Sequence, residues 1–293
     1  MIVKFAVSDP KGLRHVAKGR MEHHIKPNSS GTLVATTPAS AGWKNLGFKV
    51  IKLQVGETIS VSTEGNEVAV VPLQGGARLE TAGQTFNVSR KGVFEEVPHV
   101  LYLPPNNELK ITATTELEIA WGSAPATGKY PVRLFKPDEM KKEVRGGGAA
   151  KRQVNHILNA PLPAERLILF EVYVPGGSWS GYPPHCHDGK FGSPYLEETY
   201  YYRISPENGF AIHRNYDIDT DFDELFTVKN GDLVLVTKGF HPVSAAPGSN
   251  IYFLNFLAGD LLDEARATPP YDDPNYAWLK QDWEGKPLAL PLI

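Results

Sequence analysis

The chain has 293 residues, of which 41% are apolar and 22% charged, which is typical of a globular protein with a substantial core. The net charge of −3 gives no basic surface for neutralising phosphates, so we expect no nucleic-acid partner. The single cysteine, Cys186, excludes a secreted scaffold held together by disulfides.

Charged residues recur from Lys4 onward, which is not the pattern of a signal peptide. No apolar run approaches the roughly 20 residues that span a bilayer. We therefore expect a cytoplasmic protein without a membrane partner. The 27 glycines and 24 prolines favour many short strands joined by turns over long helices.

The first half of the chain contains short apolar runs separated by turn signals, as a β-sandwich or barrel requires. Gly75-Gly76 is interpreted as a turn that ends one of these strands. The predicted strands cover residues 47–55, 67–73, 77–80, 85–88, 109–113 and 117–121.

The composition changes in the middle of the chain, where a charged run from Lys136 to Arg145 precedes Gly146-Gly147-Gly148. We interpret residues 136–152 as a linker and the charged run as a solvated face. Strand signals then resume in residues 167–174, 198–203, 210–216, 225–228, 233–237 and 251–257. The sequence thus predicts an all-β chain with few helices and two barrels in tandem, covering residues 1–135 and 153–293.

The second half contains His185-Cys186-His187, followed after a loop by Leu196-Glu197-Glu198-Thr199-Tyr200. Side chains alternate along a strand, so His185 and His187 share one face and Cys186 points to the other. A carboxylate on the next strand completes a set of ligands. Glu197 and Glu198 lie on opposite faces of that strand and are therefore alternatives.

A third histidine, His241, follows the turn at Gly239 and returns over the mouth of the barrel. Three imidazoles with one carboxylate suit zinc, manganese, iron or nickel. His-x-His alone is a weak signal, but the later carboxylate and the Gly-x-His sequence make a metal site the stronger interpretation. No such cluster is present in the first half.

These motifs resemble the cupin superfamily and, more narrowly, the 5-deoxy-glucuronate isomerase family of inositol catabolism. The resemblance is densest between about residues 166 and 260 and extends to the first half. The segments that carry it are Ser180–Asp188, Leu196–Arg203, Asn208–Ala211, Gly239–Gly248, Arg90–Glu95 and Leu101–Pro104.

The resemblance implies two cupin (jelly-roll) domains, the first without metal ligands. It also implies one divalent cation, zinc first, with manganese, iron and nickel as alternatives. The family pattern favours Glu198 over Glu197 as the carboxylate ligand, and the implied ligand set is His185, His187, Glu198 and His241.

The implied reaction is an aldose–ketose isomerisation of a small sugar acid, either by proton transfer between C1 and C2 or by a hydride shift. The candidates for the proton-transfer group are Tyr200, Tyr202, Glu197 and His213. The candidates for binding the substrate carboxylate are Arg203, Arg214 and Arg152.

Three alternatives use the same ligands: an isomerase acting on another uronate, a cupin dioxygenase, and a non-catalytic sugar-binding cupin. The sequence also allows a homo-oligomer. It predicts neither the native metal nor the identity of the base.

Overall fold

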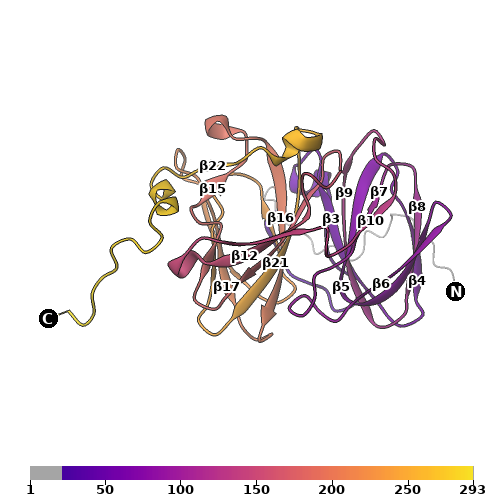
Figure 1. The fold of residues 1–293 in the computed structure, drawn as a ribbon, viewed down its shortest axis with the longest axis horizontal. Helices are drawn as coiled ribbons and strands as arrows, with labels where there is room; N and C mark the ends of the chain where they lie inside the picture. The colour runs from indigo at the N-terminus through magenta and orange to yellow at the C-terminus, as the bar shows by residue number, and fades with distance from the viewer. Residues whose placement is uncertain (1–21, 293) are drawn as a thin grey trace.

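The computed structural model describes residues 22–292, and nearly all of their regular structure is β-strand (Figure 1). Two strand-built units lie side by side, the first in indigo to magenta and the second in magenta to yellow. Helices are short: α1 (Pro38–Ala41), and the 3-10 turns η1 (Gly148–Ala150), η2 (Lys190–Gly192), η3 (Asp263–Ala267) and η4 (Ala277–Lys280).

The first barrel is built on one nine-stranded sheet in which β10-β7-β5-β9-β3-β2 form the main path. Three further strands, β4, β6 and β8, extend it from the far end of β5. The strands are β2 (Gly31–Thr36), β3 (Gly47–Leu53), β4 (Thr58–Ser62), β5 (Asn66–Thr81), β6 (Gln84–Arg90), β7 (Val100–Leu103), β8 (Glu108–Ala113), β9 (Leu117–Pro125) and β10 (Arg133–Phe135).

The second barrel has a seven-stranded sheet, a four-stranded sheet and a short strand pair. The large sheet runs in the order β1 (His24–Ile25), β19 (Leu233–Val236), β16 (Leu196–Ser205), β21 (Asn250–Gly259), β13 (Ile168–Val174), β12 (Arg152–Leu158) and β11 (Lys141–Arg145). The smaller sheets are β14 (Trp179–Ser180), β20 (Val243–Ala245), β17 (Ala211–Tyr216) and β18 (Asp223–Val228), and the pair β15 (His185–Cys186) with β22 (Tyr271–Asp272).

The predicted turn at Gly75-Gly76 is wrong, because β5 continues through it. β5 pairs with β9 as far as Gln74 and with β6 from Gly75 onward. Gly75 has a φ of 90°, and a Cβ there would lie 1.9 Å from the carbonyl oxygen of Glu116. Glycine therefore lets one long strand pass from one part of the barrel to the next.

The predicted linker, residues 136–152, contains an edge strand of the second barrel. All five residues of β11 pair with β12, from Lys141 opposite His156 to Arg145 opposite Arg152. The N-terminal strand β1 likewise belongs to the second barrel, since His24 pairs with Val234 on β19. Both segments that flank the first barrel are thus part of the second.

The two large sheets pack against each other through a buried apolar core that joins residues of both barrels. Phe48 of the first barrel and Phe256 of the second have ring centroids 5.2 Å apart. Gly122 makes room for this contact, since a Cβ there would lie 2.0 Å from the Phe256 ring. Tyr201 on β16 joins the same cluster and has no exposed surface.

Two buried glutamates clamp the barrels together in a reciprocal way. The Glu67 carboxylate on β5 accepts hydrogen bonds from the backbone N–H groups of Glu165, Arg166 and Leu167, at 2.6–2.8 Å. These three residues immediately precede β13 of the second barrel. A carboxylate with several backbone donors is a strong, charge-assisted anchor.

Glu197 on β16 makes the converse contact. Its carboxylate accepts the backbone N–H groups of Lys44, Asn45 and Leu46, at 2.7–2.9 Å. These residues immediately precede β3 of the first barrel. A tyrosine hydroxyl completes each glutamate: Tyr102 donates to Glu67 at 2.8 Å, and Tyr195 donates to Glu197 at 3.0 Å.

We expect Glu67→Gln to lower the free energy of unfolding by about 2–4 kcal/mol, because it removes the charge and leaves buried N–H donors without an acceptor. Urea denaturation followed by circular dichroism measures this change. The control is Glu108→Gln, at an exposed position of β8, for which we expect less than about 0.5 kcal/mol. Equal stability of the two variants would contradict the anchoring role of Glu67.

Candidate active site

Side chains on the inner face of the second barrel bring His187, Glu198 and His241 together. His187 follows β15, Glu198 lies on β16, and His241 precedes β20. One ligand atom from each of these residues lies within 4.8 Å of the other two, and all three residues are buried. Cys186 is fully buried on the other side, among Tyr216 and Phe240.

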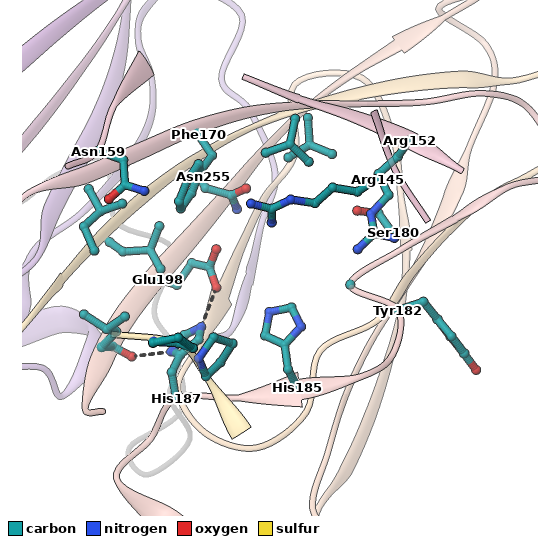
Figure 2. Close-up of a pocket in the computed structure, with 18 of the residues that line it drawn as sticks. Arg145, Arg152, Asn159, Phe170, Ser180, Tyr182, His185, His187, Glu198 and Asn255 are labelled. Carbon is teal, nitrogen blue, oxygen red and sulfur yellow. Dashed lines mark hydrogen bonds and ion pairs between the residues drawn. The ribbon is translucent and has the colours of Figure 1, made fainter. Parts of the chain in front are cut away.

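His185 lies beside this cluster. Its ring centroid is 4.7 Å from that of His241 and 6.2 Å from that of His187. Figure 2 shows its ring directed into the space in front of Glu198. His185, His187 and Glu198 therefore line one side of a common cavity, and His241 is buried directly behind them, with its ring centroid 4.8 Å from that of His187.

Backbone carbonyls fix the orientation of all three imidazoles. Each Nδ1 faces a carbonyl oxygen: Leu196 for His187 at 2.9 Å, Gly239 for His241 at 3.2 Å, and Pro183 for His185 at 3.4 Å. If Nδ1 carries the proton and donates it, the lone pair of each Nε2 is left for another partner. This is the arrangement by which proteins prepare histidines as metal ligands.

The residues of this cluster fit a cation. The buried His241 Nε2 has no hydrogen-bond partner in residues 22–292, although it lies 3.3 Å from Glu198 Oε2. His187 Nε2 lies 2.8 Å from the same oxygen. Burial opposes ionisation of Glu198, but contacts with His187 and His241 lower its pKa to about 2, so it is a carboxylate at neutral pH. An anionic oxygen facing imidazole nitrogens is a donor set that suits a transition-metal ion.

The cluster opens into a cavity of about 580 Å³ (Figure 2). One part of its wall is apolar and includes Phe170 and Phe253. Besides His185, His187 and Glu198, the polar side chains that line it are Arg145, Arg152, His156, Asn159, Ser180, Tyr182, Tyr200, Asn255, Arg266, Thr268, Asp272 and Lys280. A cavity with a few converging polar groups is the usual form of a small-molecule site.

Of the four proton-transfer candidates, the structure places Tyr200 in the cavity wall. Burial, and then the charge of Glu198, raise the pKa of Tyr200 well above its usual value, so its hydroxyl keeps the proton at neutral pH. Tyr202 stacks beside it with ring centroids 6.1 Å apart, but is not part of the cavity wall.

His213 and Glu197 lie away from the cavity. His213 is fully buried, with Nδ1 2.6 Å from the Tyr202 hydroxyl and Nε2 2.8 Å from Asn215 Oδ1, so both ring nitrogens have partners. Burial lowers the pKa of His213 to about 3. Glu197 points to the opposite face of β16, where it binds the first barrel. Neither side chain is placed to exchange a proton with a ligand in the cavity.

The three arginine candidates for binding the substrate carboxylate lie in different places. Arg152 lines the cavity, and Figure 2 shows it beside Arg145 in the wall. Arg203 forms an ion pair with Glu118 of the first barrel. Arg214 is bound by Asp223 at 2.7 Å on the exposed side of β17 and β18. The structure therefore brings Arg152 to the site and leaves Arg203 and Arg214 outside it.

Arg152 has no carboxylate within ion-pair distance among the described residues; its Nη1 donates to the Ala150 carbonyl at 3.0 Å. Burial, and then the charge of Arg145, lower its pKa to about 10, which still leaves it cationic at neutral pH. Arg152 is half-buried, and a cation that is partly shielded from water without an anion is costly, so this position is suited to an anionic ligand.

Sequence reasoning did not include several residues of the cavity wall, notably Arg145, His156, Asn159, Lys280 and Trp283. Arg145 and His156 form a cluster with Glu143, whose Oε1 lies 2.5 Å from Arg145 and 2.8 Å from His156. Most of β11 is exposed, as the charged run predicts, and the sequence holds no local signal for the pairing with β12 that brings Arg145 to the cavity. The described part of the chain has no helix that is both long and apolar enough to span a membrane.

Comparison with known proteins identifies relatives over most of the chain. The sequence profile of the KduI/IolB family matches residues 21–279. The 5-deoxy-glucuronate isomerase of Geobacillus thermodenitrificans is 42% identical over 261 residues, covering 87% of this chain and 93% of that relative. The protein of the same name from Bacillus subtilis strain 168 is 32% identical over 264 residues, covering 88% and 96%.

Solved structures give the same result for the fold. An IolB-like protein from Salmonella typhimurium is 38% identical, with a TM-score of 0.84 over 88% of this chain and 99% of that chain. The oxalate decarboxylase of Lactobacillus farciminis is 12% identical, with a TM-score of 0.60 over 83% and 88%, and is similar in fold alone. The predicted all-β fold of two cupin domains in tandem is confirmed, as is the family resemblance.

We expect His241→Ala to lower the affinity for a divalent ion by more than about 100-fold. Removing a residue that only hydrogen-bonds to a metal ligand already lowers metal affinity by about 10- to 100-fold, and His241 is proposed as a ligand itself. Elemental analysis after dialysis measures the bound ion. The control is His99→Ala, in the first barrel and outside the cavity. Wild-type metal content in the dialysed His241→Ala protein would contradict the assignment of this residue as a ligand.

Proposed function

Since the chain belongs to the KduI/IolB family, we propose that it is an aldose–ketose isomerase that converts 5-deoxy-D-glucuronate to 5-dehydro-2-deoxy-D-gluconate in myo-inositol catabolism. The observation that carries the proposal is one cavity that joins the buried His187–Glu198–His241 cluster to the unpaired cation of Arg152. The cluster, when it holds a cation, suits a carbonyl or hydroxyl oxygen of the substrate, and Arg152 suits a carboxylate. A sugar acid has both groups on one short chain.

We propose that His185, His187, Glu198 and His241 hold one divalent ion, with zinc as the first candidate because imidazole and carboxylate are among its usual ligands. Such an ion, when bound, polarises a carbonyl and stabilises negative charge on its oxygen. A backbone carbonyl lies beside each Nδ1, which leaves the three Nε2 atoms as the ligand atoms in this proposal. Reorganisation of these side chains on ligand binding therefore costs little free energy.

Arg152 binds the substrate carboxylate in this proposal. Its planar guanidinium suits a bidentate pair with a carboxylate, and its burial strengthens the attraction relative to water. Binding the acid end at a fixed point positions C1 and C2 at the other end of a short sugar chain. The neighbouring charge of Arg145 adds to the positive potential of this wall.

Tyr200 has a different role, because its raised pKa makes it a poor base and a good hydrogen-bond donor. The isomerisation moves one hydrogen from C2 to C1 and one proton from the C2 hydroxyl to the C1 oxygen. We propose that the Tyr200 hydroxyl holds its proton and donates it as a hydrogen bond to a substrate oxygen. Asn255, which contacts the same hydroxyl, fixes the direction of the donor.

The direct test is turnover of 5-deoxy-glucuronate by the metal-loaded protein, with Arg152→Met and Arg214→Met as a matched pair. We expect Arg152→Met to lower kcat/KM by about 100-fold, mainly through KM, because it removes the half-buried cation that pairs with the substrate carboxylate in this proposal. Arg214→Met should stay within about threefold, since that side chain already pairs with Asp223 at the surface. No turnover by the wild type would overturn the proposed function, whereas equal KM values for the two variants would overturn the role of Arg152.

A second pair of variants tests Tyr200. We expect Tyr200→Phe to lower kcat by about 100-fold, because it removes a donor from the cavity. Tyr202→Phe should lower kcat by less than about tenfold, since its hydroxyl binds His213 behind the wall. Steady-state kinetics at saturating substrate measures both. A larger effect from Tyr202→Phe would reverse the assignment.

A further inference from the structure

The C-terminal segment after β21 returns to the cavity and becomes part of its wall. Its strand β22 pairs with β15, with Asp272 opposite His185. The chain then passes through η4, whose last residue Lys280 forms an ion pair with Asp272. Both Lys280 and Trp283 line the cavity, together with Arg145 and Gly146.

Trp283 packs on the glycine stretch that follows β11. A Cβ at Gly147 would lie 2.9 Å from the Trp283 Cβ, and one at Gly148 would lie 3.0 Å from the Trp283 carbonyl oxygen. Gly147 has an extended backbone with a φ of −154°, a conformation that any residue adopts. Glycine is therefore needed at 147 for the close approach of Trp283 and not for the backbone.

The same stretch contacts the proposed carboxylate-binding arginine. A Cβ at Gly146 would lie 2.7 Å from Arg152 Nη1, and the neighbouring Gly147 contacts Trp283. Arg145 precedes these glycines and lines the same cavity. The indole is thus held against the backbone that carries both cationic side chains. An apolar ring at this place excludes water, and this strengthens the pairing of arginine with an anion.

Trp283 and Lys280 lie beyond residue 279, where the match to the family profile ends. We propose that Trp283 is a specificity-determining residue: packed on Gly147, it covers the acid end of the cavity and increases the preference for a sugar acid over a neutral sugar. This inference rests on the proposed function. Trp283 touches no reacting atom, so its effect falls on substrate binding and not on the chemical step.

The test compares Trp283→Ala with Trp278→Ala, a tryptophan of the same segment that is 51% exposed and outside the cavity wall. We expect Trp283→Ala to raise KM for 5-deoxy-glucuronate by about tenfold with kcat within about threefold. The inhibition constant of 5-deoxy-glucose, which has a hydroxymethyl group in place of the carboxylate, should change by less than about twofold. Trp278→Ala should match the wild type in both measurements.

A second variant disrupts the contact between Trp283 and Gly147 by changing the glycine. Gly147→Val retains the tryptophan in the sequence but puts a side chain where the indole packs, so the indole must move away. This variant should therefore raise KM for the acid as Trp283→Ala does. The control is Gly65→Val, since a Cβ there would meet nothing within 4 Å. Thermal unfolding verifies that each variant is folded.

The outcomes separate the two proposals. Absence of turnover by the wild type would overturn the proposed function and this inference with it. Normal wild-type turnover with unchanged KM in Trp283→Ala and Gly147→Val would overturn the role of Trp283 alone. An equal rise in KM for the acid and in the inhibition constant of the neutral sugar would also overturn it, because the tryptophan would then not discriminate charge.

Discussion

The reciprocal pair of buried glutamates is the constraint on which the rest of this structure depends. Each is the second residue of a long strand, β5 or β16, and each accepts three consecutive backbone N–H groups just before a strand of the other barrel's large sheet, β13 or β3. A buried carboxylate is stable in this setting because its charge is spread over several donors. The two barrels are thereby fixed by the same contact made twice, in opposite directions.

This arrangement gives β16 two functions on its two faces. Glu197 and Tyr201 face the first barrel, whereas Glu198 and Tyr200 face the cavity. Because side chains alternate, holding one face in place also sets the depth and direction of the other. The ligand-poor first barrel therefore has a physical part in the site: it supplies the donors that position the strand of Glu198, although none of its side chains enters the cavity wall.

Sequence reasoning succeeded where side-chain alternation and motif spacing decide the outcome, as for the two barrels and for the opposite faces on which Glu197 and Glu198 lie. It failed where pairing between distant segments decides. Arg145 belongs to a charged run that is typical of solvent-exposed surface, and only its strand pairing with β12 brings it to the cavity. Arg203 and Arg214 resemble anion binders in sequence, but Glu118 and Asp223 neutralise them, and no local pattern reveals such partners.

The course of the N-terminal strand has a consequence for dissecting the molecule. β1 crosses from the start of the chain to the edge of the second barrel, where the Leu235 N–H also donates to the His23 carbonyl at 2.8 Å. Asp232 beside it lies 2.8 Å from His24 Nε2 and 2.6 Å from Lys26 Nζ. A gene fragment encoding only residues 136–292 would leave that sheet edge bare and that carboxylate without these two partners. Cutting the chain between the barrels would therefore remove an edge strand and both side-chain partners of Asp232 from the barrel that holds the site.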